Sequence, residues 1–284
     1  MEMRWKTESG PRPVIREKNG VVWLSFPLLE QTGMVVQGFT TRLGGVSRGI
    51  FSSMNLSFTR GDEEEAVREN FRRAGAAMGF SVESIVTSDQ THTNHVRRVS
   101  GKDCGSGILR PRNYSQIDGL LTDEPGVTLA TFYADCVPLF FVDPVHHAIA
   151  LSHSGWRGTV QRIGRVTVEK MKQEFGSRPE DLVTAIGPSI CQDCYEVGED
   201  VAEAFYEEFG RDADRTLLYE KGGGKYLLNL WEANRRVLTE AGVPGEKIQM
   251  PCICTCCNPE FLFSHRASHG KRGNLGAFLM LKRP

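Results

Sequence analysis

The longest apolar stretch of the chain covers residues 128–142 and ends at Asp143-Pro144. Asp and Pro favour the first two positions of a β-turn, so we expect the chain to reverse its direction there. A second apolar stretch, residues 147–153, follows directly. Two apolar stretches joined by a turn predict a buried β-hairpin near the middle of the chain.

Other segments show helical periodicity. Residues 159–175 place apolar side chains at helical spacing and precede Gly176, a favourable residue just beyond a helix end. Apolar residues also share one face over residues 63–78. The remaining expected elements are helices over residues 200–209 and 230–241 and strands over residues 21–26 and 34–39. These elements, joined by short connections, predict an α+β fold.

Two histidines and one cysteine stand out because each lies beside small or turn-forming residues. His92 ends the segment Gln90-Thr91-His92, Cys136 ends Ala134-Asp135-Cys136, and His153 begins a segment that continues to Gly158. Two imidazoles and one thiol suit a zinc ion whose fourth position stays open for water or substrate. Such an ion can lower the pKa of a bound water or polarise a substrate atom. The trio therefore predicts a catalytic metal site.

The expected hairpin brings two of these residues together. If its turn is centred on Pro144 and Val145, Cys136 lies opposite His153, and directly opposed Cβ atoms are about 4.5–5.5 Å apart. The prediction depends on the register, because a slip of one residue would place the two side chains on opposite faces. Pro138 also lies in this stretch, and proline cannot donate to a central strand ladder.

The three segments resemble the laccase-domain family, also called YfiH-like or polyphenol-oxidase-like. That family has a glutamine-x-histidine element, an alanine-aspartate-cysteine element and a histidine-alanine-glycine-tryptophan-arginine-glycine element in the same order. Further matches in family order cover residues 39–47, 55–56, 61–62, 69–70, 118–122, 186–188, 194–197 and 263–266. Departures occur at Thr93, Ser154 and residues 265–267, and none of them removes a metal-ligand candidate.

The resemblance implies a single domain over residues 1–284, with mixed β-sheets covered by helices. It also implies one zinc ion held by His92, Cys136 and His153. Family members are similar to purine nucleoside enzymes that cleave adenosine, inosine and methylthioadenosine with phosphate and that deaminate adenosine. We therefore expect a zinc-dependent purine nucleoside phosphorylase with adenosine deaminase activity, whose partners are purine nucleosides and phosphate.

Three further residues are candidates for substrate contact or proton transfer. Arg42 and Arg157 lie beside glycines, where backbone can approach a ligand, and arginine is well suited to bind phosphate. A helix beginning near Thr159 would add N–H groups and a positive dipole end. Asp118 is the expected acid or base in deamination. Asp135 is expected to point away from Cys136, because neighbours in a strand face opposite sides.

Several alternative functions remain open. A blue-copper site also uses two histidines and a cysteine, which would suit a copper polyphenol oxidase, but multicopper centres need many histidines and this chain has seven. Cys136 and His153 without a metal would suit a cysteine hydrolase. Some bacterial members of the family carry the label of a peptidoglycan-editing factor. A scaffold without catalysis would tolerate the loss of His92.

Composition excludes some partners. The net charge of −1 gives no general attraction to nucleic acid or to an anionic membrane. Residues 1–8 contain no apolar signal core, and no apolar segment has the length of a membrane span. We therefore expect a cytoplasmic protein that binds neither nucleic acid nor membrane.

Six of the eight cysteines fall into two groups, Cys191 and Cys194, and then Cys252, Cys254, Cys256 and Cys257. Both groups contain Cys-x-x-Cys spacing, which allows a second, structural zinc site. However, the roughly 60 residues between the groups exceed the usual spacing in zinc sites. Disulfides are disfavoured in a reducing compartment. The sequence therefore favours their interpretation as small, buried apolar residues.

Overall fold

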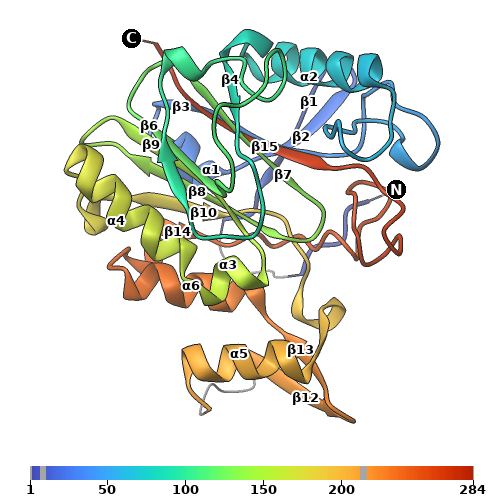
Figure 1. Ribbon diagram of the computed structural model, residues 1–284, viewed down its shortest axis with the longest axis vertical. Coiled ribbons are helices and arrows are strands. Elements are labelled where there is room, and N and C mark those ends of the chain that lie inside the picture. The colour runs from blue at the N-terminus through green and yellow to red at the C-terminus, as the bar shows by residue number, and fades with distance from the viewer. Residues whose placement is uncertain (1, 7–10, 212–215, 284) are drawn as a thin grey trace.

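The computed structural model describes residues 2–6, 11–211 and 216–283; part of the polar amino-terminal segment, residues 1 and 7–8, lies outside these ranges. Six α-helices occur in the described part of the chain (Figure 1). They are α1 (Pro27–Glu30), α2 (Glu64–Met78), α3 (Trp156–Val160), α4 (Ile163–Phe175), α5 (Glu199–Phe209) and α6 (Leu230–Glu240). None of these helices has both the length and the apolar composition needed to cross a lipid bilayer.

The strands form three sheets of mixed or antiparallel order. The first sheet consists, in spatial order, of β1 (Val14–Lys18), β2 (Val21–Ser25), β3 (Val35–Thr40), β15 (Leu275–Leu281), β7 (Thr128–Tyr133) and β4 (Ile85–Thr87). The second consists of β14 (Ile248–Gln249), β10 (Val183–Ile186), β8 (Val137–Asp143), β9 (Ala148–Ser154), β6 (Gly119–Thr122) and β5 (Val96–Arg98). A small sheet contains β11 (Glu196–Gly198), β13 (Lys225–Leu228) and β12 (Leu218–Gly222).

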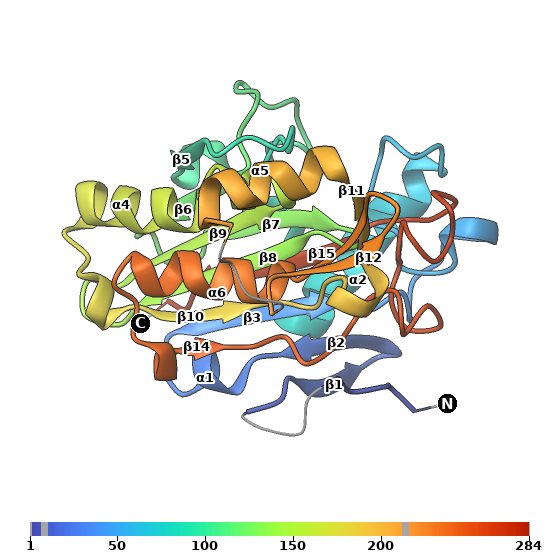
Figure 2. The same ribbon diagram turned by 90° about the horizontal axis from the view of Figure 1, so that it is seen from below.

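The two large sheets pack face to face and are covered by helices on their outer faces. Strand β8 is apolar on both sides: Leu139 and Phe141 face the core under α4 and α6, whereas Phe140 and Val142 face the core between the sheets. Helix α2 covers the outer face of the first sheet, and Phe71 packs there. Figure 2 shows α4, α5 and α6 together on the opposite side. The expected α+β fold with mixed sheets and covering helices is confirmed.

Most elements expected from the apolar pattern are present. The two early strands and the helices expected over residues 63–78, 200–209 and 230–241 match β2, β3, α2, α5 and α6 to within one residue at each end. The helix expected over residues 159–175 is wrong in its first part. The chain forms α3 from Trp156, then breaks at Arg162, which takes a left-handed conformation (φ 56°) before α4 begins.

The central hairpin exists, but its register differs from the expected one. Strands β8 and β9 pair so that Pro138, and not Cys136, lies opposite His153. The turn is longer than expected and covers residues 144–147, because Asp143 pairs with Ala148. This slip of two residues preserves the face of every side chain, since strands repeat every two residues. Cys136 directly precedes β8, two residues before Pro138, and so still lies near His153.

The apolar stretch over residues 128–142 is two strands in different sheets and not one. Strand β7 belongs to the first sheet and β8 to the second, and residues 134–136 connect them. Asp135 takes a positive φ of 93° at this crossing, so the expectation that it is a strand neighbour of Cys136 is wrong. The alanine-aspartate-cysteine segment is thus a link between the sheets.

Phe140 tests the core between the sheets. Its side chain is fully buried in β8, and its ring centre lies 4.8 Å from that of Phe26. We expect Phe140→Ala to lower the free energy of unfolding by about 3–5 kcal/mol, because it removes apolar contacts and leaves a cavity. Chemical denaturation measures the change. Val145→Ala, in the exposed hairpin turn, is the control and should change stability little; equal losses in both variants would contradict this account.

Candidate active site

His92, Cys136 and His153 meet at one place although they come from three separate segments. Their ligand atoms lie within 4.8 Å of one another, and the two imidazole ring centres are 5.0 Å apart at an angle of 77°. His92 lies in the loop after β4, Cys136 ends the crossing between the sheets, and His153 lies near the end of β9. The three residues form a group that could hold a metal ion.

The buried carboxylate of Asp118 fixes the positions of His92 and His153 through hydrogen bonds. Asp118 precedes β6 and is fully buried. It accepts a hydrogen bond from Nδ1 of His153 (2.8 Å) and from the backbone N–H groups of Thr91 (3.1 Å), His92 (3.1 Å) and Thr93 (2.8 Å). The Thr93 hydroxyl adds a further bond of 2.9 Å. Because Nδ1 of His153 is bonded to Asp118, Nε2 is the ring nitrogen that could serve as a metal ligand.

The charges of these groups depend on one another. Burial raises the pKa of the Cys136 thiol, but the imidazoles of His153 and His92 outweigh burial and lower it to about 6. Burial lowers the pKa of His153, but the Cys136 sulfur and Asp118 raise it to about 9. Burial also opposes ionisation of Asp118, yet the bonds from His153, Thr93 and Thr91 hold its pKa below the usual value. The two imidazoles therefore favour the thiolate form of Cys136, which is the form that binds metals and attacks electrophiles.

Gln90 fixes the start of the His92 loop. Its side-chain amide donates to the Phe132 carbonyl and accepts from the Phe132 N–H, both at 2.7 Å, so it extends the pairing of strand β7. His92 itself takes a left-handed conformation with φ 65°. The glutamine in the sequence motif is thus an anchor for the histidine two residues later.

Gly155 gives the trio the space it needs. A Cβ atom on Gly155 would lie 2.9 Å from Cδ2 of His92 and 3.2 Å from Sγ of Cys136. The φ of Gly155 is −75°, which any residue can adopt, so the requirement for glycine comes from the neighbouring side chains and not from the backbone. The sequence places Gly155 beside His153 but gives no sign of this contact.

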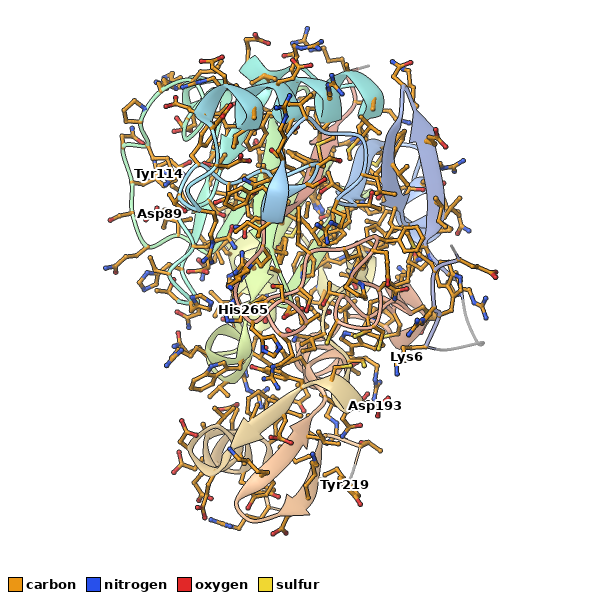
Figure 3. The ribbon with its side chains drawn as sticks, turned by 90° about the vertical axis from the view of Figure 1, so that its right-hand side faces the viewer. Lys6, Asp89, Tyr114, Asp193, Tyr219 and His265 are labelled. Carbon is orange, nitrogen blue, oxygen red and sulfur yellow. The ribbon has the colours of Figure 1, made fainter. Side chains whose placement is uncertain are left out.

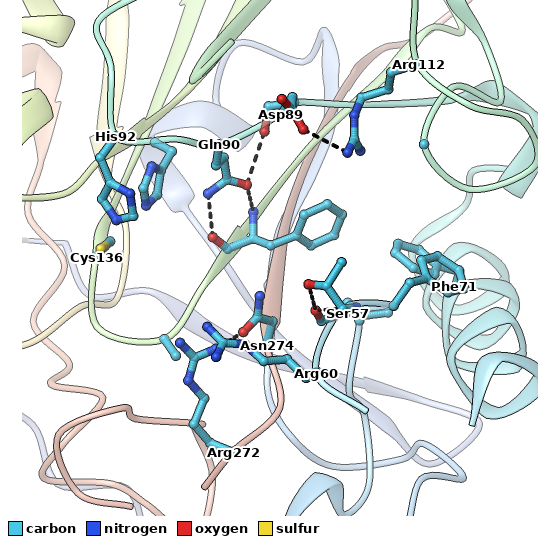
Figure 4. Close-up of a pocket in the computed structure, with 18 residues that line it drawn as sticks. Ser57, Arg60, Phe71, Asp89, Gln90, His92, Arg112, Cys136, Arg272 and Asn274 are labelled. Atoms are coloured by element: carbon cyan, nitrogen blue, oxygen red, sulfur yellow. Dashed lines mark hydrogen bonds and ion pairs between the residues drawn. The ribbon is translucent and has the colours of Figure 1, made fainter. Parts of the chain in front are cut away.

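The trio lies at one end of a cavity of about 390 Å³, within the usual size range of small-molecule sites (Figure 4). The remaining lining residues are mainly polar and aromatic: Leu56, Ser57, Phe58, Thr59, Arg60, Phe71, Ser88, Asp89, Gln90, Gly107, Arg112, Phe132, Ala134, Arg272 and Asn274. Arg112 is paired with Asp89 at 2.9 Å. The cavity can therefore take an uncharged ring together with a polar or charged group.

Two other arginines in this cavity have no acidic partner among the described residues. Arg272 is buried; burial and the nearby Arg60 lower its pKa to about 10. One terminal nitrogen of Arg272 donates to the Gly273 carbonyl and to Asn274, whereas its Nε has no hydrogen-bond partner in the described ranges. Figure 4 shows Arg60 and Arg272 close together in the cavity. A buried, unneutralised guanidinium with a free donor suits an anion.

Arg42 and Arg157 differ from the sequence-based expectation, because neither lines this cavity. Arg42 donates to the carbonyls of Ser52 and Pro259, both at 2.8 Å, and its guanidinium lies over the ring of Phe263. These contacts connect two loops, so the guanidinium of Arg42 has a structural role.

Arg157 lies within the short helix α3, and its guanidinium is 4.3 Å from the ring centre of Trp156. The helix start expected near Thr159 is also absent, since α3 begins at Trp156. No sequence pattern distinguishes Arg272, because a single arginine beside Lys271 is typical of an exposed turn. Arg60 lies just before the matched family element at residues 61–62, but nothing in the sequence separates it from other surface arginines.

Comparisons with known proteins show the family of this chain. Residues 36–282 match the family model described as multi-copper polyphenol oxidoreductase laccase. The purine nucleoside phosphorylase YlmD of Bacillus subtilis is 37% identical over 252 residues, which cover 87% of this chain and 89% of the relative. Adenosine deaminase RL5, from an unknown prokaryotic organism, is 34% identical over 233 residues, which cover 81% of this chain and 88% of the relative.

The crystal structure of YlmD from Geobacillus stearothermophilus has a similar fold. It superposes with a TM-score of 0.87 at 34% sequence identity, and the match covers 95% of this chain and all of that one. Sequence motifs, fold and relatives thus agree, and the chain belongs to the multi-copper polyphenol oxidoreductase laccase family, as the YfiH-like motifs indicated.

Proposed function

We propose that this protein is a zinc-dependent purine nucleoside phosphorylase that cleaves adenosine, inosine and methylthioadenosine and also deaminates adenosine in the same site. The names of the relatives support the two activities separately. One observation carries the proposal: the candidate metal ligands share a cavity with Arg272, a buried cation that has an unpaired donor. Phosphorolysis needs both a nucleoside site and an adjoining phosphate site.

Zinc fits the donors of the trio. Two imidazoles and a thiolate are common zinc ligands, and the cavity leaves the fourth direction open. When bound, zinc would supply Lewis acidity, which activates a water or polarises a substrate atom. Copper is less favoured, because multicopper oxidation needs more histidines. Among the described residues, no further histidine joins His92 and His153 in such a group.

Arg60 and Arg272 hold phosphate beside the ribose. A phosphate oxygen bonds to the anomeric carbon while the glycosidic C–N bond breaks. The electron pair of this C–N bond passes to the purine nitrogen, which takes up a proton. The guanidinium groups orient the phosphate and offset its charge. The rings of Phe58, Phe71 and Phe132 supply an apolar wall for the purine base.

Deamination uses the same trio and needs no phosphate. Water adds to the purine carbon that bears the amine. The amine then gains a proton, its bond to carbon breaks, and it leaves as ammonia. Asp118 serves both reactions as a positioning residue. Its carboxylate is fully buried, has five donors and does not line the cavity, which favours this role over the direct acid–base role expected from the sequence. Asp89 is the carboxylate that lines the cavity.

A metal-free cysteine hydrolase is the second candidate, because Cys136, His153 and Asp118 are arranged like a nucleophile, a base and an orienting acid. This alternative gives no role to His92, which contacts the same sulfur. An acyl group trapped on Cys136 after incubation with an activated ester, in protein free of metal, would favour the hydrolase. Its absence would favour the nucleoside enzyme.

Product analysis tests the phosphate site. Inosine incubated with phosphate should yield hypoxanthine and ribose 1-phosphate, and adenosine should also yield inosine when phosphate is omitted. We expect Arg60→Ala to raise the KM for phosphate by about tenfold or more, because it removes a charge-assisted hydrogen bond, and to leave deamination nearly unchanged. Arg165→Ala, an exposed arginine on α4, is the control. An unchanged phosphate KM would remove Arg60 from the site.

Metal analysis tests the trio and the role of Asp118. Cys136→Ala should lose about one zinc ion per chain and both activities, since it removes one of the three candidate zinc ligands. Asp118→Asn should weaken zinc binding by about 10- to 100-fold, because its amide cannot accept all of the N–H donors that face it. If Asp118→Asn keeps full zinc affinity and loses only turnover, Asp118 takes part in proton transfer instead. Full zinc retention in Cys136→Ala would refute the metal assignment.

Gly155→Ala tests the close packing of the trio. The added methyl group must displace the His92 ring, so we expect weaker zinc binding and loss of both activities with little change in the free energy of unfolding. Gly158→Ala in the same segment is the control, because its new Cβ would meet neighbours only at 3.4 Å or more. Equal zinc affinity in both variants would show that the space beside Gly155 is not required.

A further inference from the structure

Four cysteines from the two sequence groups come together on the side of the protein that carries the small sheet. Cys191, Cys194, Cys254 and Cys257 have sulfur atoms that all lie within 4.8 Å of one another. The hydrogen-bond geometry gives 3.5 Å between the sulfurs of Cys194 and Cys257. Cys191 and Cys254 are buried, whereas Cys194 and Cys257 are half-buried. This group is separate from the cavity, which none of the four lines.

Strand topology removes the objection raised by the long spacing in sequence. Strands β10 and β14 run parallel, so their carboxyl ends lie at the same edge of the second sheet. A parallel bridge between Ser189 and Cys254 continues this pairing beyond the strands. The first Cys-x-x-Cys turn follows Ser189, and the second begins at Cys254. Their separation of 63 residues therefore disappears in the folded chain.

The four sulfurs have the arrangement that a single tetrahedral ion requires. A Zn–S bond of about 2.3 Å places the sulfurs of a tetrahedral site about 3.8 Å apart. The observed spacing brackets that value. Backbone N–H groups also point at the sulfur of Cys254, from Cys191 at 3.3 Å and from Cys257 at 3.4 Å. Such bonds stabilise thiolates, the protonation state that ligates a metal.

We propose that Cys191, Cys194, Cys254 and Cys257 bind a second zinc ion in a closed, structural site. All four positions are filled by protein sulfur, so no position remains for water or substrate, and the ion has no catalytic role. Beside this group, Lys6 is paired with Asp193, the residue before Cys194, at 2.9 Å, which ties the amino-terminal segment to the first Cys-x-x-Cys turn (Figure 3). A cluster of several iron ions needs more room than this sulfur spacing leaves.

The second ion fixes the loop that contains Cys254 and Cys257, and this loop contacts the segment that carries Cys136. Thr255, between two of the ligands, donates from its hydroxyl to the Asp135 carboxylate at 2.6 Å. Asp135 precedes Cys136 in the crossing between the sheets, and its other oxygen accepts the N–H of Arg266. The loop with the second pair of cysteines also bridges to Trp5 through Ile253. The structural ion therefore stabilises the position of Cys136 without contacting substrate.

Metal content and cobalt spectra test this site separately from the catalytic one. Wild-type protein should contain about two zinc ions per chain. Cys194→Ser and Cys257→Ser should each lose one zinc ion and lower the melting temperature. Cys256→Ser, in the same loop but outside the group of four, should keep both ions. In Cys136→Ala, which lacks the catalytic ligand, cobalt(II) should still give the intense visible bands of a tetrahedral four-sulfur site.

Other measurements keep the proposal open to refutation if the serine variants do not fold. X-ray absorption at the zinc edge of Cys136→Ala should show four sulfur neighbours at about 2.3 Å. Nitrogen or oxygen neighbours in their place would overturn the tetrathiolate site. So would iron instead of zinc, or a Cys194–Cys257 disulfide in protein purified without oxidant. Failure of nucleoside cleavage would leave these results unaffected, so the two proposals are tested independently.

Discussion

The hydrogen bonds of the Asp118 carboxylate are the constraint on which the candidate site depends. A buried carboxylate is stable only if its oxygens are fully satisfied, and here the donors come from the end of β9 and from the His92 loop. Satisfying one charge therefore fixes two histidines at once. The same contact selects the ring nitrogen of His153 that faces Cys136 and the cavity.

The crossing between the sheets supplies the third member of the trio. Strand β7 ends in one sheet and β8 begins in the other, so residues 134–136 must turn sharply at the seam. Asp135 has an unfavourable positive φ, and the hydrogen bonds that its carboxylate accepts from Thr255 and Arg266 stabilise this conformation. Cys136 is thereby held between two layers of core, where burial and two imidazoles decide its charge.

The elements that could be predicted from the sequence are those with a strong apolar period. Helices α2, α5 and α6 and strands β2 and β3 follow directly from it. The hairpin register differs from the expected one by two residues, yet Cys136 and His153 remain close, because Cys136 lies two residues before Pro138, the partner of His153. The break at Arg162 has no apolar signal, since its ion pairs with Glu208 and Glu240 form only after α5 and α6 dock.

The parts of the site that escaped prediction depend on distant packing. Arg272 resembles an exposed arginine in the sequence, and only the folded loops bury it. The long spacing between the two cysteine segments disfavours a shared metal site in the sequence. In the folded chain, the parallel strands β10 and β14 bring these segments together, and no local sequence pattern shows this pairing. The glycine neighbours of Arg42 and Arg157 favour close approach of a ligand to the backbone, but local backbone freedom does not show which way a side chain points.

The position of the trio at the seam between the sheets also determines when it can form during folding. No single hairpin or helix contains all three residues, because His92 follows the first sheet, His153 belongs to the second, and Cys136 links them. Contacts of this kind close long loops and so assemble late. A nascent chain or partly folded intermediate therefore lacks the complete set of donors, which only the docked sheets bring together.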